Sequence, residues 1–131
     1  MLPRSRMLSV VMLRILFDKN VPWPLIRHLS GYQVTTAERA GWGQISNGIL
    51  ISRAEAAGYD IMVTCDQNIQ YQQNLSGRRI SMVVLSSNFW PNIKINVADV
   101  LAAVARSSPG SFENVDIIPT LRHRHPGDTV L

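Results

Sequence analysis

The sequence predicts an α/β fold with a central, mostly parallel sheet flanked by helices. Segments with strand and helix patterns alternate along the chain, an order typical of parallel sheets joined by crossover helices. The strand-like runs at 13–17, 61–65 and 80–85 are continuously apolar rather than alternating, as expected for strands covered on both faces. With 131 residues and 46% hydrophobic composition, the chain suits one compact domain.

The first predicted strand runs from 13 to 17 and ends at a charged residue. Pro22 is expected at the first position of the following helix, where a missing backbone N–H costs no hydrogen bond. Gly31 ends that helix, and a second strand is expected at 32–36 because its residues favour extended structure. The domain is therefore predicted to begin with a strand, a helix and a second strand.

A second helix is expected to begin after Ser46, whose side chain suits the position that caps a helix. Leu50, Ala54 and Ala57 recur at helical spacing and give this helix an apolar face, and Gly58 ends it. The elements expected downstream are a strand at 61–65, a short helix or turn at 67–74, a strand at 80–85, a helix capped by Asn96, and an edge strand at 112–118.

Arg4 and Arg6 precede an apolar stretch at 7–16 and imitate the start of a secretory signal. No small-residue cleavage site follows, and the stretch is shorter than the roughly 20 apolar residues that span a bilayer. We therefore expect a cytoplasmic protein with no membrane partner. Its predicted organisation is a leader extension at 1–11, one domain at 12–119 and a mobile basic tail at 120–131.

The formal charge of +4 and the pI near 9.8 describe a modestly basic chain, which favours encounter with phosphate backbones without requiring it. Cys65 is the single cysteine, so no intrachain disulfide forms and a reducing compartment is the simpler assumption. The apolar run around Cys65 predicts a buried structural thiol. Neither feature identifies an activity.

Two aspartates come directly after predicted strands, Asp18 after the first and Asp66 after the third. In open α/β sheets ligands bind outside the carboxyl ends of the strands, so neighbouring strands would bring both carboxylates into one crevice. Paired negative charge there calls for a cation, and Mg²⁺ or Mn²⁺ prefers such oxygen ligands. Alternatively, Asp18 forms a turn with Asn20, and Asp66 only caps the segment after its strand.

Polar and aromatic side chains near the two aspartates are the next candidates. An amide oxygen completes a metal shell or holds water or phosphate, and an aromatic ring stacks on a base. A lysine beside the site would neutralise phosphate. These residues are Lys19, Asn20, Asn47, Asn68, Tyr71, Trp23 and Trp42. Each of them also has an ordinary role as a turn, capping or packing residue.

The segment from Arg14 to Pro22, RILFDKNVP, resembles the opening of the small bacterial PIN-like proteins. The similarity continues through 43–57, with a helix that begins at Ser46-Asn47-Gly48. It includes 58–68, GYDIMVTCDQN, which resembles the family's strand ending in T-x-D. The resemblance extends from Leu13 to Leu85 and implies a three-layer PIN-like fold.

This resemblance implies a metal-dependent ribonuclease, in which clustered acidic residues hold Mg²⁺ or Mn²⁺ and activate water against an RNA phosphodiester. Asp18 and Asp66 match two of those acids and are the implied catalytic and metal-binding residues. Many relatives are the toxin halves of toxin–antitoxin pairs, and relatives often form dimers. The implied partners are therefore RNA, an antitoxin protein and a second copy of the chain.

Two positions depart from the family pattern. Asn47 stands where many relatives place the acid that opens the middle helix, and Asn68 replaces a further acid after T-x-D. Fewer negative charges predict weaker metal binding and favour one ion over two. The alternative function is a catalytically weak or inactive module that binds RNA or a protein partner. A receiver-like signalling domain fits less well, because Asp18 is followed by Lys19 and no lysine ends the strand at 80–86.

Overall fold

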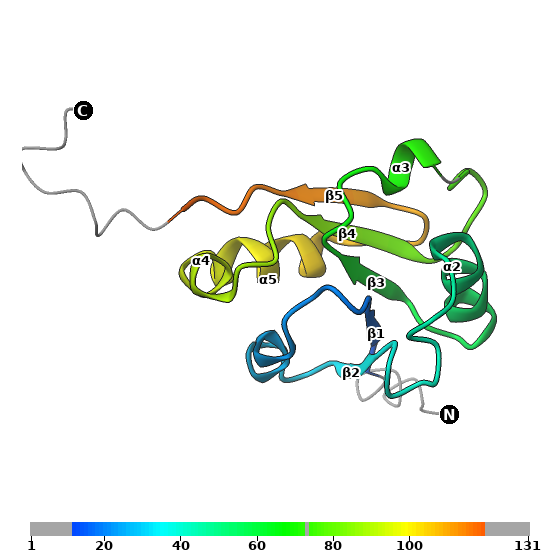
Figure 1. Ribbon diagram of the computed structural model, residues 1–131, viewed down its shortest axis with the longest axis horizontal. Coiled ribbons are helices and arrows are strands. Elements are labelled where there is room, and N and C mark those ends of the chain that lie inside the picture. Colours follow the sequence, from blue (N-terminus) through cyan, green and yellow to red (C-terminus); the bar gives the residue numbers. More distant parts are fainter. Residues whose placement is uncertain (1–11, 73, 120–131) are drawn as a thin grey trace, which may run out of the picture.

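A computed structural model of the protein describes residues 12–72 and 74–119, so the predicted leader and tail lie outside the described residues. Five strands form one sheet in the order β2-β1-β3-β4-β5, and every pairing is parallel (Figure 1). The strands are β1 (Arg14–Phe17), β2 (Gln33–Thr36), β3 (Ile61–Thr64), β4 (Ser81–Leu85) and β5 (Phe112–Val115). The predicted α/β fold with a central parallel sheet is confirmed.

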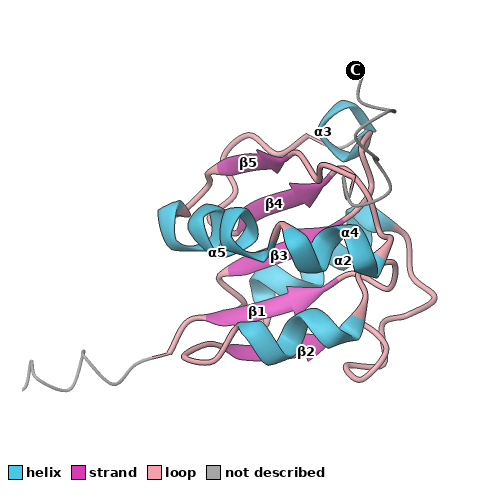
Figure 2. Ribbon diagram, turned by 90° about the vertical axis from the view of Figure 1, so that its left-hand side faces the viewer, coloured by secondary structure: helices cyan, strands magenta, loops and turns pink. Residues whose placement is uncertain are grey.

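Helices cover both faces of the sheet and give the fold three layers. Helices α4 and α5 lie on one face with the 3₁₀ helix η1, and α2 lies on the other (Figure 2). Their bounds are η1 (Trp23–His28), α2 (Asn47–Ala56), α3 (Ile69–Gln72), α4 (Trp90–Ile95) and α5 (Val97–Arg106). The sequence does not predict α4, because its six residues are too few to show an apolar period. Among the described residues, no helix has the length and apolarity to cross a membrane.

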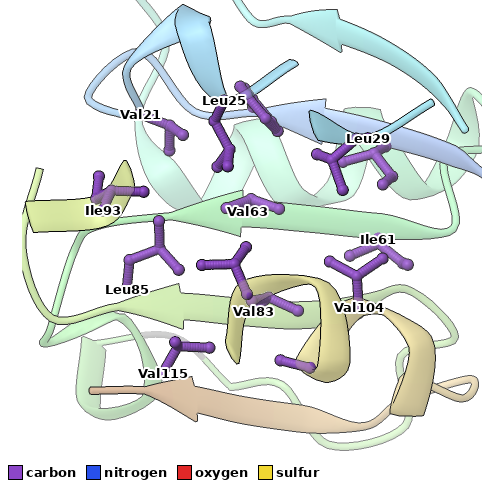
Figure 3. Packing of buried hydrophobic residues seen from close by; sticks show 14 of the residues in the cluster. Val21, Leu25, Leu29, Ile61, Val63, Val83, Leu85, Ile93, Val104 and Val115 are labelled. Atoms are coloured by element: carbon purple, nitrogen blue, oxygen red, sulfur yellow. The ribbon is translucent and has the colours of Figure 1, made fainter. Parts of the chain in front are cut away.

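Two hydrophobic clusters hold the layers together, because successive residues of a strand point to opposite faces of the sheet. On one face Val63 of β3 and Val83 of β4 pack toward Leu25 of η1 and Val104 of α5 (Figure 3). The other cluster includes Leu16, Met62, Met82 and Val84 of the strands with Leu50, Ile51 and Ala54 of α2. Burying an aliphatic side chain of this size contributes about 1.5–3 kcal/mol, so the central strands form a rigid base for their loops.

The first helix is a 3₁₀ helix and not an α-helix. Pro22 has extended backbone angles, φ −62° and ψ 127°, and precedes the helix as its capping residue, whereas the sequence predicts it inside the first turn. The amide of Leu25 donates to the carbonyl of Pro22 and that of Leu29 to Ile26, and both bonds span three residues. Pro22 and Pro24 lack N–H donors, which leaves few bonds for a regular α-helical turn.

The two predicted capping residues stand at helix starts without capping the helix through their side chains. Ser46 precedes α2 and Asn96 precedes α5, and neither side chain forms a cap hydrogen bond. Asn96 instead donates from Nδ2 to the carbonyl oxygens of Asn92 at 2.7 Å and Ile118 at 2.8 Å. Ala57 is exposed just beyond α2, so it is not part of the helix's apolar face as predicted.

The strand order creates a reversal between β1 and β3. From β1 the chain crosses outward to the edge strand β2, and it then returns past β1 to form β3, β4 and β5 in turn. Connections that leave the carboxyl ends of β1 and β3 therefore run in opposite directions, which opens a crevice between them. Asp18 directly follows β1, and Asp66 lies two residues beyond β3.

Candidate functional site

Asp18 is held rigidly at the end of β1. Its backbone N–H donates to the carbonyl of Val63 at 2.9 Å, which extends the pairing of β1 with β3 by one residue. The side chain is only 5% exposed. Its carboxylate accepts hydrogen bonds from the backbone N–H of Lys19 and from the hydroxyl of Thr64, both at 2.7 Å. A buried carboxylate is thus oriented by two neutral donors.

Thr64 connects the two aspartates through one hydroxyl group. Its Oγ1 donates to Oδ2 of Asp18 and accepts the backbone N–H of Asp66 at 3.1 Å. Thr64 is fully buried, so water does not compete for these bonds. The end of β3 therefore fixes the position of one carboxylate and the backbone of the other.

Asp66 has two further partners, one local and one distant. The backbone N–H of Asn68 donates to its Oδ1 at 3.0 Å, which is the turn that a capping role predicts. Asn47 donates from Nδ2 to Oδ2 at 2.6 Å across 19 residues of sequence. Because α2 begins at Asn47, the start of this helix is directed at the strand ends. Asp66 is therefore more than a local capping residue.

Two amide side chains tie the loops around the aspartates together. Asn20 accepts the backbone N–H of Cys65 at 3.1 Å through Oδ1, which joins the loop after β1 to the loop after β3. Gln67 donates from Nε2 to the carbonyl of Cys65 at 3.2 Å and also to the carbonyl of Leu85. The second bond joins the loop after β3 to the end of β4. Three strand ends are thereby held in one arrangement.

These groups surround a pocket of about 510 Å³, which we call the carboxylate pocket. Its lining residues are Asp18, Lys19, Asn20, Trp42, Gly43, Ile45, Ser46, Asn47, Cys65, Asp66, Gln67 and Asn68. The structure thus brings together the predicted site residues except Trp23, which lines an adjoining pocket, and Tyr71, whose side chain is not among those described. Lys19 is exposed at this pocket and supplies its one cationic group among the described residues.

A second pocket of about 310 Å³ adjoins the first, and we call it the flanking pocket. The two pockets share Asp18, Lys19 and Asn20. The flanking pocket is otherwise lined by Val21, Pro22, Trp23, Thr36, Glu38 and Asn88. A groove therefore runs across the ends of β2, β1 and β3, with Asp18 and Lys19 at its centre.

The chain was compared with protein-family models, with curated proteins and with solved structures. None of them matches it. The chemistry of the site therefore follows from its own geometry and charge. The two ion pairs within the described residues, Arg78–Glu55 and Arg106–Glu113, lie elsewhere and leave both aspartates without a cationic partner.

The donor atoms of the carboxylate pocket fit a hard divalent cation. Each carboxylate oxygen has two acceptor sites, so Asp18 and Asp66 keep acceptor capacity after the hydrogen bonds described above. Mg²⁺ often binds through one or two carboxylates while water and substrate complete its shell. Within the described residues, no group of three or more His, Cys, Asp or Glu side chains converges. The residues present therefore fit one ion held by two carboxylates.

Cys65 lies in the loop after β3 and lines the carboxylate pocket, but it does not suit nucleophilic chemistry. Burial, and then the nearby negative charge of Asp18, raise the pKa of its thiol to about 12. The thiol therefore stays protonated at neutral pH, and its Sγ donates to the carbonyl of Ser87 at 3.5 Å. Cys65 is partly buried, whereas the sequence predicts a buried thiol.

Thr64, Gln67 and Glu38 are among the residues at or beneath the groove that the sequence did not mark as site residues. Thr64 carries a usable signal, because it is the single hydroxyl residue at the end of an otherwise apolar strand. Gln67 lies in an amide-rich segment where nothing distinguishes it from its neighbours. Glu38 follows β2 in a loop without periodicity, and only the sheet order reveals that this loop lies beside Asp18.

Proposed function

We propose that the protein is a metal-dependent ribonuclease of PIN-like type and that the carboxylate pocket is its active site. The observation that carries this proposal is the pair Asp18 and Asp66, joined through one buried hydroxyl at neighbouring strand ends and left without a cationic partner among the described residues. The resemblance of 13–85 to PIN-like proteins independently assigns the same two residues as metal ligands.

In this proposal Asp18 and Asp66 hold Mg²⁺ or Mn²⁺. A bound divalent cation supplies the positive charge that a phosphodiester requires beside two carboxylates. Thr64 keeps the Asp18 carboxylate aimed at the pocket, and Asn47 restrains the Asp66 carboxylate from the opposite wall. The residues proposed to position substrate and water are Lys19, Asn20, Asn47, Asn68 and Tyr71.

Lys19 has a distinct part in binding RNA. Its side chain is exposed where the two pockets meet, and it forms no ion pair within the described residues. An ammonium group is a compact charge with three donors, suited to a phosphate oxygen. We assign Lys19 to the phosphate group next to the scissile phosphodiester, because Lys19 is the one cationic residue that lines either pocket among the described residues.

The same resemblance makes the toxin half of a toxin–antitoxin pair part of this proposal. An antitoxin protein would then block the groove, and a second copy of the chain would form a dimer. Induced expression of wild type should arrest growth of a bacterial host, whereas a variant without Asp18 and Asp66 should not. Growth arrest by both proteins to the same extent would contradict the toxin assignment.

A second candidate function is an inactive module that binds RNA or a protein partner. The observation that favours it is that every carboxylate oxygen of Asp18 and Asp66 already accepts a hydrogen bond from the protein. Asn47 and Asn68 also stand where many PIN-like proteins carry acids. This function predicts binding that survives addition of EDTA, and loss of all binding on chelation would argue against it.

The test of the proposed ribonuclease uses the purified full chain on mixed RNA with Mn²⁺. Wild type should cleave, and the double variant Asp18→Asn, Asp66→Asn should lose activity by about a hundredfold or more, because preorganised charge at the reacting phosphate is removed. Calorimetry on the same samples should show Mn²⁺ binding in wild type alone.

The matched control is the double variant Asp99→Asn, Asp116→Asn. It removes the same number of negative charges from exposed positions that line neither pocket of the groove. This control should cleave like wild type. If residual cleavage is equal in wild type and in Asp18→Asn, Asp66→Asn, the activity comes from a contaminant and the catalytic proposal is lost.

A further inference from the structure

The flanking pocket differs from the carboxylate pocket in the residues that line it. Beyond the residues that the two pockets share, it is lined by Val21, Pro22, Trp23, Thr36, Glu38 and Asn88. It therefore combines an aromatic ring, a carboxylate and an amide, which are the groups that recognise a nucleobase. A phosphate would meet the negative charges of Asp18 and Glu38 here, so the pocket suits a neutral group that carries N–H donors.

Trp23 is the most exposed large hydrophobic residue of the described chain, with 58% of its surface accessible. Its position is well defined, because Pro22 and Pro24 restrict the backbone on both sides. The guanidinium of Arg27 lies 5.0 Å from the centroid of the Trp23 ring, a cation–π contact that restrains the indole. Exposure of such a ring costs hydrophobic stabilisation, and a stacking base would recover it.

Glu38 is also held in place while its carboxylate stays accessible. A Cβ atom added at Gly43 would come within 3.1 Å of Cγ of Glu38, so the loop that leads to α2 packs directly against the stem of this side chain. The carboxylate forms no ion pair within the described residues. Glu38 is therefore an exposed acceptor that lines the flanking pocket from the loop after β2.

We propose that the flanking pocket is a base-binding subsite for single-stranded RNA, in which guanine stacks on Trp23 and donates to Glu38. This proposal rests on the proposed function, because it takes the phosphate of that nucleotide to lie at Lys19 beside the carboxylate pocket. Guanine is the preferred base because its Watson–Crick edge presents two adjacent N–H donors to one carboxylate. Uracil presents one N–H between two carbonyl oxygens, which a carboxylate repels.

The strand must be single, since a paired base has its Watson–Crick edge occupied and its faces stacked on neighbours. Different parts of the groove then bind different parts of the RNA. Trp23 and Glu38 bind the base, Lys19 binds the phosphate, and the carboxylate pocket receives the bond to be cut. Cleavage should therefore occur next to guanine in unpaired regions.

The test measures fluorescence anisotropy of two labelled RNA octamers, one all uridine and one with a single central guanosine, with the full chain in Mg²⁺ and in EDTA. Wild type should bind the guanosine octamer about tenfold more tightly, in line with the discrimination of one base by a specific contact. Trp23→Ala should weaken binding of both octamers by about tenfold, the size of one stacking interaction. Glu38→Gln should abolish the preference and leave uridine binding unchanged.

Two variants serve as controls. Phe89→Ala removes another exposed aromatic side chain, 57% accessible, that lines neither pocket, and Asp99→Asn removes an exposed acid on α5. Both should bind like wild type. Any one of three results overturns the subsite. Wild type binds neither octamer detectably, wild type binds both octamers with equal affinity, or Trp23→Ala and Phe89→Ala bind the octamers with equal affinity.

The subsite and the ribonuclease can fail separately. A guanosine preference that depends on Trp23 and Glu38, without any cleavage in Mn²⁺, supports the subsite and overturns the proposed enzyme. Cleavage that depends on Asp18 and Asp66 but shows no preference for unpaired guanosine overturns the subsite and leaves the enzyme in place. Mapping of cleavage products on the same octamers separates these results.

Discussion

The two ends of the sheet use charged side chains differently. At the amino ends of the strands, charged side chains join the strand starts to neighbouring segments. The backbone N–H of Arg14 donates to Asp60 at 2.9 Å, its guanidinium donates to the carbonyl of Ala57, and the same group lies 4.2 Å from the centroid of the Tyr59 ring. One cation thus joins the start of β1 to the turn that precedes β3.

Glu55 is the clearest example at this end. Its carboxylate accepts the backbone N–H groups of Arg79 and Ile80, the latter at 3.2 Å, and pairs with Arg78 at 3.4 Å. These partners, the N–H of Arg79 foremost, hold the pKa of Glu55 below its ordinary value of 4.5. The negative charge of Glu55 therefore stabilises the fold by joining α2 to the start of β4.

The carboxyl ends present the contrast. Asp18 and Asp66 have neutral partners, namely backbone N–H groups, a hydroxyl and an amide, and neither forms an ion pair within the described residues. Both aspartates line the carboxylate pocket, so their negative charges border the same space. Under the proposed function, the chain uses charge for stability at the amino ends and keeps two carboxylates for a metal ion at the carboxyl ends.

The most severe test of this contrast removes the hydroxyl that connects the two aspartates. Thr64→Val keeps the shape of the side chain but leaves Oδ2 of Asp18 and the N–H of Asp66 without their donor and acceptor in a buried place. The free energy of unfolding, measured in urea, should fall by about 2 kcal/mol or more. The Asp18 carboxylate would also lose its orientation, so metal binding should weaken.

Thr64→Ser is the control, because it retains the hydroxyl and loses one methyl group. Its unfolding free energy should fall by about 1 kcal/mol, the cost of a buried methyl, with metal binding intact. Equal stability of Thr64→Val and wild type would show that water or the backbone replaces the hydroxyl, and Thr64 would then not be the link between the aspartates.

A smaller effect is expected at the amino end. Glu55→Gln removes a charge that three donors stabilise, so the unfolding free energy at neutral pH should fall by about 1 kcal/mol. Because the pKa of Glu55 is lower in the folded than in the unfolded protein, its contribution is complete above about pH 4.5. The contribution is lost as the pH falls through the folded pKa, so variant and wild type should converge in acid.

Glu38→Gln is the matched control for this comparison of stability. Glu38 is an exposed glutamate with no ion pair within the described residues, so its replacement should change the unfolding free energy by less than about 0.5 kcal/mol. If Glu38→Gln lowered the unfolding free energy as much as Glu55→Gln does, the two ends of the sheet would not differ in how they use charge.

The amount that the sequence predicts differs between the backbone and the site. Strands β1, β3 and β4 follow from continuous apolar runs, and the positions of Asp18 and Asp66 follow from where two of those runs end. Their proximity depends on which strands are neighbours, and that order is set by packing between distant segments. The bridge through Thr64 and the contact of Asn47 with Asp66 span such segments, so periodicity does not reveal them.

The helix ends show the same limit. Asn96 occupies a capping position that propensity predicts, yet its side chain donates to the carbonyls of Asn92 and Ile118. Local preference predicts the residue type at the start of the helix. The hydrogen-bond partner of its side chain depends on where the segment after β5 packs. Glu38 entered no sequence-based set of candidates, because an acid in a loop has no pattern until the loop is placed against a strand end.

The smallest expected change in stability is the most informative about function. Asp66→Asn removes one of the two carboxylate charges and keeps an oxygen that can accept the N–H of Asn68. Its new NH₂ group can donate to the amide oxygen of Asn47 once that amide turns over, which replaces the bond from Asn47 to Asp66. Without metal the variant should therefore match wild type within about 0.5 kcal/mol or exceed it. Mn²⁺ should then raise the melting temperature of wild type more than that of the variant, because a ligand stabilises only the state that binds it. A clear loss of stability in EDTA would mean that Asp66 serves the fold as Glu55 does. The carboxyl end would then be no different from the amino end, and the case for a metal site there would be lost.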